Sequence, residues 1–287
     1  MPILPLFTQH SRHWQQNRYV YPVISRRSRG LSIGVNLNPD KVCNFDCVYC
    51  CVDRTQPPTI RDVDLDVLRE ELDHLLGLAI SGELFQQPPF DQTPPNLRRI
   101  NDVAFSGDGE PTSFQQFGEA CRIAVELIER RARPDIKIVI ITNATLFHQK
   151  RVAEALAYLD EHDGEIWAKL DAGTQAYYRL IERTSIPLRR VLDNILAAGR
   201  VRPIVIQALF LQLNGKGPPP GEIDAFVERL KELVAGGCRI KLVQVYTIAR
   251  ETAVAECTPL PAAELDAISE LVRRETGLAV ETYYGPS

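Results

Sequence analysis

The chain has 287 residues, of which 45% are hydrophobic and 24% charged, and its formal net charge is −4. This length suits a single α/β barrel of roughly 200–250 residues with extensions, whose core needs no disulfide for stability. The acidic balance gives no general attraction to nucleic acid, and the sequence shows neither a signal peptide nor an apolar run of about 18 residues. We therefore expect a cytoplasmic protein without a membrane segment, in which the seven cysteines bind metal or remain buried thiols.

Short apolar runs alternate with longer amphipathic segments along most of the chain. Residues 1–30 are expected to form an N-terminal extension, and residues 31–287 a single domain. Strands are predicted at 31–36, 102–106, 137–143, 165–171, 203–213, 239–246 and 278–283. Helices are predicted between them at 62–76, 114–131, 149–159, 187–198, 222–234 and 261–275. The alternation predicts an α/β fold, a partial (βα)6 TIM-type barrel. A doubly wound sheet also fits this order, and the barrel is preferred because the chemistry falls at the strand ends.

A cysteine motif, NPDKVCNFDCVYC, follows the first of these strands. Cys43, Cys47 and Cys50 have the spacing C-x3-C-x2-C on a loop, where thiolates can converge on one metal centre. A structural zinc site needs four closed ligands, and no second Cys/His pair stands at a suitable distance, so zinc is disfavoured. Three cysteines on a [4Fe–4S] cluster leave one iron open to a small molecule. Cys51 is interpreted as an uninvolved thiol, and the role of Cys257 is open.

The spacing resembles the signature of the radical S-adenosylmethionine (SAM) superfamily. The resemblance implies that the open iron binds the amino and carboxylate groups of SAM, and that an electron from the cluster breaks a sulfur–carbon bond to yield a 5′-deoxyadenosyl radical. It also implies an electron donor such as a flavodoxin or ferredoxin. The segments YPVISRR, LSIGVNLNPD, CNFDCVYC, FSGDGEPT and KLDAGT, between about Tyr21 and Arg250, are similar to the branch related to the wyosine tRNA-modifying synthases.

Polar residues follow the predicted strands and form the expected cofactor site. The turn Gly107–Asp108–Gly109–Glu110 exposes backbone groups and a carboxylate, which suit an ammonium group. The resemblance implies that this turn holds the amino group of SAM, and that Asn143 and Asp171 contact its ribose or carboxylate. Tyr49, which precedes the last motif cysteine, is also predicted to bind the cofactor. Lys169 alternates with Asp171 on its strand, so a buried ion pair of these two residues is an equal alternative.

The substrate stays open at this point. Archaeal wyosine enzymes carry a second cysteine cluster, which is not expected here because residues 1–30 contain no cysteine. The 287 residues are expected to leave no room for the flavin domain of the eukaryotic enzymes. Three hypotheses remain: a radical SAM enzyme acting on a small molecule or a protein side chain, a tRNA-modifying enzyme with the same chemistry, and an iron–sulfur electron carrier or sensor without catalysis. A basic face near the cluster would favour tRNA. The strip Arg26, Arg27 and Arg29 is interpreted as solvated surface rather than a phosphate site.

Overall fold

A curved sheet forms the centre of the molecule. The computed structural model describes residues 5–8, 12 and 14–286, and within them eight strands pair in the order β1-β2-β3-β4-β5-β6-β8-β10. The strands are β1 (Val20–Ser25), β2 (Gly30–Val35), β3 (Ile100–Phe105), β4 (Lys137–Thr142), β5 (Gly164–Lys169), β6 (Ile204–Leu209), β8 (Ile240–Tyr246) and β10 (Val280–Tyr283). Neighbours are parallel, except that β1 pairs antiparallel with β2. A separate antiparallel pair joins β7 (Leu211–Leu213) and β9 (Cys257–Pro259).

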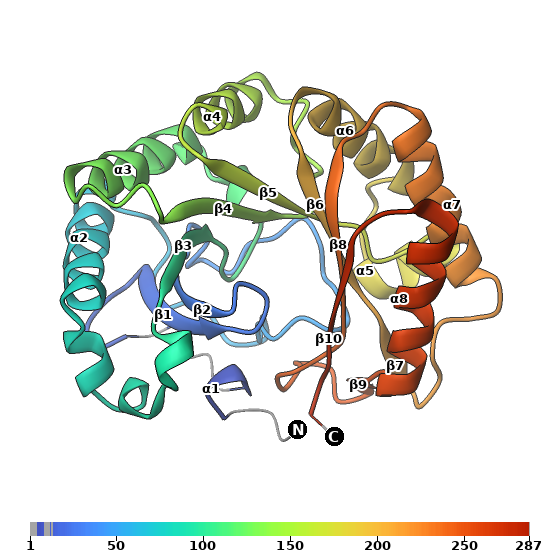
Figure 1. The fold of residues 1–287 in the computed structure, drawn as a ribbon, viewed down its shortest axis with the longest axis horizontal. Helices are drawn as coiled ribbons and strands as arrows, with labels where there is room; N and C mark the ends of the chain where they lie inside the picture. The colour runs from blue at the N-terminus through green and yellow to red at the C-terminus, as the bar shows by residue number, and fades with distance from the viewer. Residues whose placement is uncertain (1–4, 9–11, 13, 287) are drawn as a thin grey trace.

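Helices connect the parallel strands and cover the outer, convex face of the sheet (Figure 1). They are α2 (Leu65–Ser81), α3 (Phe117–Arg130), α4 (Lys150–Asp160), α5 (Gln175–Glu182), α6 (Leu188–Val201), α7 (Glu222–Ala235) and α8 (Ala262–Thr276). A short helix, α1 (Pro5–Thr8), precedes the sheet, and 3-10 turns occur at η1 (Glu83–Gln86), η2 (Phe90–Gln92), η3 (Pro95–Leu97) and η4 (Pro111–Ser113). Over the described range, six strand–helix units run from β2 to α8, so the predicted partial barrel is confirmed.

The strands form where the sequence has short apolar runs. β2 and β6 are buried along their whole length, as expected of parallel strands covered on both faces. The predicted strand 203–213 is wrong at Phe210, where the chain leaves the main sheet and its remaining residues, β7, pair with β9. The helix α5 was not predicted, because it has only eight residues.

The strand β1 lies inside the stretch expected to be an N-terminal extension. Its segment VYPVIS contains Pro22, which cannot donate to a strand ladder and is tolerated at a sheet edge. β1 is such an edge, and all six of its residues pair with β2. Residues 20–25 are therefore an integral part of the sheet.

The barrel is partial, because the edge strands β1 and β10 are not neighbours in the sheet order of the described chain, and the β1–β2 turn contacts the other edge of the sheet. Tyr283 Oη donates to Arg27 O at 3.2 Å, and Arg26 Nη1 donates to Tyr284 O. Arg29 adds an exposed ion pair with Glu281 at 3.4 Å. These contacts place the turn beside the C-terminal end of β10 and leave a cavity inside the curve.

A helix that crosses a membrane needs about 20 consecutive, mostly apolar residues. Within the described residues, none is both long and apolar enough to cross a membrane. The cytoplasmic location stays a prediction.

Candidate cluster and cofactor site

One cavity inside the curved sheet gathers most of the residues singled out from the sequence. Its volume is about 280 Å³, and strands β1 to β6 and β8 contribute to its wall. The predicted residues that line it are Cys43, Cys47, Tyr49, Cys50, Gly107, Asp108, Gly109, Glu110 and Asn143. Loops from the C-terminal ends of β2, β3 and β4 thus meet at one place, as expected for this architecture.

The cysteine loop between β2 and α2 is fixed by its backbone. Asp46 N donates to Glu182 O at 3.0 Å, and Val48 N donates to Ile181 O at 2.8 Å, so the loop rests on the last turn of α5. A tight turn closes it where Cys50 N donates to Cys47 O at 3.0 Å. The side chains of the three motif cysteines are half-buried, whereas Cys51 is exposed.

The donor set fits an iron–sulfur cluster better than a single ion. Among the residues that the structure describes, no three His, Cys, Asp or Glu side chains come close enough to hold one metal ion. A cube of four irons is larger and accepts thiolates set farther apart around one cavity. Burial raises the pKa of the Cys43 and Cys47 thiols, and metal binding displaces such protons. Phe45 N–H points at Cys43 Sγ from 3.5 Å and can donate to a bound thiolate.

The turn after β3 packs directly against the cysteine loop. A β-carbon on Gly107 would lie 2.3 Å from Asn36 Oδ1, and one on Gly109 would lie 2.1 Å from Val42 O. Both positions therefore require glycine for the close approach of the backbones. Asp108, between them, accepts from Arg12 Nη1 and, at 2.6 Å, from Asn36 Nδ2.

Arg54 joins the same two segments, although no sequence motif pointed to it. Its Nε donates to Lys41 O at 3.1 Å, and its Nη2 donates to Asp108 O at 3.0 Å. Its Nη1 lies 3.2 Å from Cys50 Sγ, within reach of a charge-assisted bond to a thiolate. A single guanidinium thus ties the motif loop to the glycine turn.

Glu110 connects the ends of β3 and β4. Its carboxylate is buried and accepts from Thr112 N (3.1 Å), Thr112 Oγ1 (2.6 Å), Thr142 Oγ1 (2.6 Å) and Asn143 N (2.7 Å). Burial raises the pKa of Glu110 in spite of these bonds. Among the described residues, Oε2 accepts only from Asn143 N, so it has a lone pair left for one more donor, such as an ammonium.

The two other predicted cofactor residues differ in their placement. Asn143 lines the cavity, and its Nδ2 donates to Asn44 Oδ1 at 2.6 Å. Asp171 is buried and stands outside the cavity lining; it accepts from Leu209 N at 2.7 Å and from Tyr49 Oη. Lys169 Nζ is 3.5 Å from its carboxylate, so the structure contains the ion pair that was the alternative interpretation.

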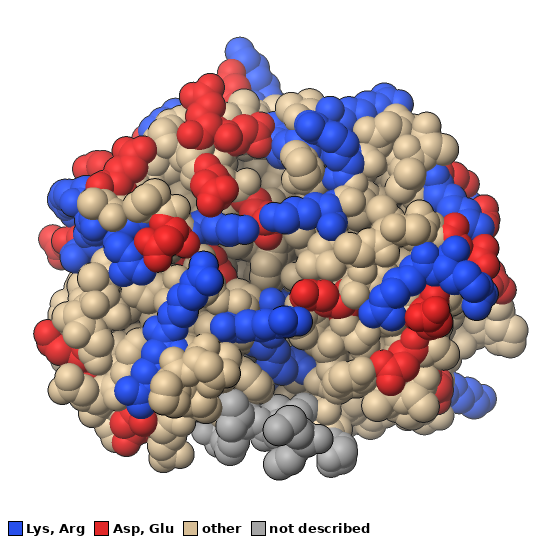
Figure 2. Space-filling model, in the orientation of Figure 1, with Lys and Arg blue, Asp and Glu red and all other residues tan. Residues whose placement is uncertain are grey.

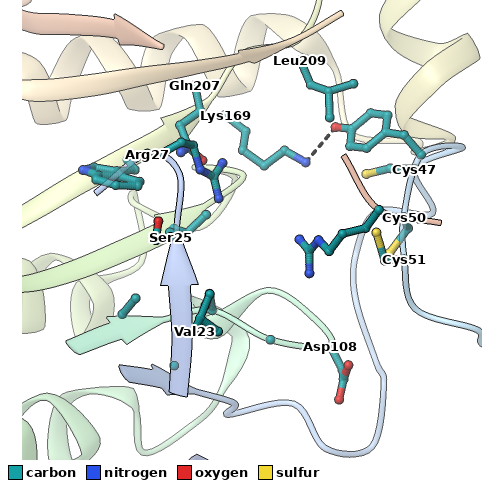
Figure 3. A pocket seen from close by; sticks show the side chains of 18 of the residues that line it. Val23, Ser25, Arg27, Cys47, Cys50, Cys51, Asp108, Lys169, Gln207 and Leu209 are labelled. Atoms are coloured by element: carbon teal, nitrogen blue, oxygen red, sulfur yellow. Dashed lines mark hydrogen bonds between the residues drawn. The ribbon is translucent and has the colours of Figure 1, made fainter. Parts of the chain in front are cut away.

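Tyr49 is the centre of a buried polar network that sequence reasoning missed. Lys169 Nζ donates to Tyr49 Oη at 2.7 Å (dashed line in Figure 3), and this hydroxyl contacts Glu182 Oε1 at 2.9 Å. Glu182 Oε2 is 2.6 Å from Cys47 Sγ, and burial raises the pKa of Glu182 to about 8. A predicted cluster ligand is therefore linked to α5, the helix that the sequence pattern did not reveal.

Comparisons with known proteins place the chain in a family. Residues 37–230, more than half of the chain, match the radical SAM superfamily. A UPF0026 protein of Helicobacter pylori strain J99 is 24% identical over 214 residues, which cover 74% of this chain. The chain spans about three fifths of the length of that relative, since the match covers 61% of it.

Solved structures of the same superfamily share the fold at low sequence identity. A radical SAM methyltransferase from Sphaerobacter thermophilus superposes with a TM-score of 0.60 at 12% identity, covering 92% of this chain and 69% of its own. SuiB of Streptococcus suis, bound to S-adenosylmethionine, superposes with a TM-score of 0.56 at 17% identity, and the match covers 90% of this chain and 49% of SuiB. TYW1 with a lysine–pyruvate adduct bound superposes with a TM-score of 0.50 at 16% identity, and the match covers 86% of this chain and 74% of TYW1.

The chain belongs to the radical SAM superfamily. The family predicted from the cysteine spacing is thus confirmed, and the structural neighbours include a TYW1 wyosine synthase. Enzymes of this superfamily use a [4Fe–4S] cluster and S-adenosylmethionine, which are the two cofactors predicted from the sequence. The roles of the individual residues and the reaction on a substrate stay predictions.

Proposed function

We propose that this protein cleaves S-adenosylmethionine reductively to a 5′-deoxyadenosyl radical, which acts on a substrate held in the central cavity. Cys43, Cys47 and Cys50 would hold the [4Fe–4S] cluster, which supplies the electron for the cleavage when bound. The observation that carries the proposal is the shared cavity of this cysteine trio and the turn from Gly107 to Glu110. A carrier or sensor without catalysis has no use for that turn.

Residues of the chain itself would bind and orient the cofactor. The free lone pair of Glu110 Oε2 suits the amino group of the methionine part, and Asn143 lines the same wall. Arg54 and the close contact at Gly109 hold the turn and the cysteine loop in fixed register, so a ligand can span both. The curved sheet surrounds the space and limits the access of water to a reactive radical.

Formation of 5′-deoxyadenosine tests the proposal. The protein is reconstituted anaerobically with iron and sulfide, reduced with dithionite in the presence of S-adenosylmethionine, and the nucleoside is quantified by chromatography. Cys47→Ala should remove the brown colour and the product, whereas Cys121→Ala should keep both, because Cys121 is a core residue of α3. Wild-type protein that holds a reducible cluster and forms no 5′-deoxyadenosine would refute the proposal.

A tRNA-modifying reaction is the second candidate. Figure 2 shows Lys and Arg side chains on both sides of a hollow near the middle of one face, mixed with acidic residues towards its periphery. Such a surface supports contacts with phosphates, and the affinity for bulk tRNA should then fall steeply between 50 and 200 mM salt. A binding assay that detects no salt-dependent complex would exclude this candidate.

A further inference from the structure

The central cavity has two chemically different ends. Figure 3 shows Cys47, Cys50 and Cys51 on one side and Arg27, with Gln207, on the other, while Lys169 extends between them. The cysteine end contains the predicted cofactor residues. The opposite end has no role in the chemistry described so far.

The lining of the cavity carries an excess of positive charge among the described residues. Six cationic side chains line it, against three carboxylates: the cations are Arg12, Arg26, Arg27, Arg54, Lys169 and Arg250, and the carboxylates are Asp102, Asp108 and Glu110. Towards the cysteines the cations have anionic or thiol partners, since Arg12 pairs with Asp108, Lys169 lies near Asp171 and Arg54 meets Cys50.

The other three arginines have no carboxylate within ion-pair distance in the described part of the chain. Arg26 donates to the backbone oxygen of Tyr284. Arg250 stands between the two ends of the cavity, because Cys51 and Arg12 on one side and Arg27 on the other all act on its guanidinium. The Arg27 guanidinium lies over the rings of Tyr246 (5.0 Å) and Trp167 (5.7 Å). Ring faces attract a cation while its N–H donors at the edge stay available to a ligand.

Their mutual repulsion shows in their acid–base properties. Burial, together with Arg27 and Arg250, lowers the pKa of Arg26 to about 10. Burial also lowers the pKa of Arg250. Asp102 faces the same region and accepts from Ser32 Oγ; burial raises its pKa to about 6, so at neutral pH its single carboxylate offsets only part of the charge of the three arginines. Unpaired charge in a partly desolvated cavity is costly, which favours an anionic partner.

A buried acceptor adds independent evidence for a ligand at this end. Gln207 is fully buried and lines the cavity, and its Nε2 donates to Gln244 Oε1 at 2.8 Å, which fixes the orientation of the amide. Its Oε1 has no hydrogen-bond partner in the structure as described. Buried polar atoms are almost always paired, so this oxygen calls for a donor from a bound molecule.

We propose that Arg26, Arg27 and Arg250 bind an oxyanion group, a phosphate or a carboxylate, of the substrate. Gln207 Oε1 accepts a hydrogen bond from the same molecule. The inference rests on the proposed function, since it takes that molecule as the target of the radical. Guanidinium groups suit both oxyanions through paired N–H donors. Held by its charged end, the substrate extends towards the cysteines.

Calorimetry with two simple probes tests the subsite. Inorganic phosphate and acetate are titrated separately into the reconstituted protein, and at least one should bind at about 1 mM or tighter, which is within the ceiling for so small a ligand. Arg27→Gln and Arg250→Gln should each weaken that binding at least tenfold. Arg61→Gln, the same charge change at an exposed position outside the cavity, should leave it unchanged. Tighter binding of phosphate or of acetate identifies the class of anion.

The same titration is repeated with saturating S-adenosylmethionine. Affinity that is independent of the cofactor supports a separate subsite. Competition between the probe and S-adenosylmethionine would overturn the inference, because it would assign the arginines to the carboxylate of the cofactor. The inference would also be overturned if neither variant weakened the binding of the probe, or if neither probe bound. If wild-type protein binds a probe through these arginines and forms no 5′-deoxyadenosine, the proposed function fails while the anion site stands.

Discussion

Gly109 packs against the cysteine loop with no room for a side chain, and Gly109→Ala tests how strictly the turn after β3 and this loop must fit. The added β-carbon would lie 2.1 Å from Val42 O and 2.7 Å from Asn38 Cβ. Non-bonded carbon atoms rest at about 3.5–4.0 Å, so the turn or the loop must move by roughly 1 Å. Gly109 is not among the glycines with positive φ, so the effect is steric rather than a backbone preference.

The displacement should reduce activity far more than stability. Overpacking of this kind costs about 1–3 kcal/mol, which a domain of this size tolerates. A misplacement of about 1 Å in a catalytic arrangement can cost roughly 100-fold in rate. We therefore expect about 100-fold slower formation of 5′-deoxyadenosine, with the iron and sulfide content close to that of the wild type, because the cysteines themselves are unchanged.

The matched control is Gly118→Ala in α3. There the β-carbon would lie 3.5 Å from Arg122 Nη1 and 3.7 Å from Ala155 Cβ, which are ordinary contacts. Alanine also favours a helix over glycine by about 1 kcal/mol, so the control should be as stable as the wild type or more so, and equally active. A Gly109→Ala protein that is folded, loaded with iron and as fast as this control would refute the argument for a strict fit.

The remaining predictions concern four cavity residues. Glu110→Gln should keep the cluster absorbance and weaken the binding of S-adenosylmethionine in calorimetry, because it removes the charge that suits an ammonium; equal affinity would contradict this role. Arg54→Gln should slow 5′-deoxyadenosine formation at least tenfold, since the bonds to Lys41 O and Asp108 O are lost; an unchanged rate would argue against this bridge. Cys51→Ala should retain full iron content, and loss of iron would make Cys51 a ligand. Burial raises the pKa of Asp102 to about 6 in the folded state, above its ordinary value in the unfolded chain. The free energy of unfolding should therefore fall by about 3 kcal/mol as the pH rises from about 4 to above 6. Asp102→Asn should remove that part of the pH dependence in denaturant titrations, and an identical slope would contradict it.

Much of the barrel could be predicted from the sequence because its parallel strands are nearly continuous apolar runs. The motif loop and the glycine turn could be predicted as well, since their chemistry lies in short contiguous segments. Arg26 and Arg27 were misinterpreted as solvated surface, because their environment depends on contacts with Tyr283 and Tyr284, more than 250 positions away. Glu182 carries no local signal either, because its role depends on the distant Cys47.

The charge balance of the loaded site points towards an anionic substrate even when the cofactors are counted. A [4Fe–4S] cluster held by three thiolates carries a net charge of about −1, or about −2 once it is reduced, and S-adenosylmethionine largely offsets this charge. S-adenosylmethionine carries a sulfonium and an ammonium against one carboxylate, and it therefore adds positive charge. The acidic Asp108 and Glu110 are already engaged at the cysteine end, and Asp102 supplies one negative charge against three arginines. The surplus at Arg26, Arg27 and Arg250 thus persists in the assembled enzyme, and the substrate is the component that can neutralise it.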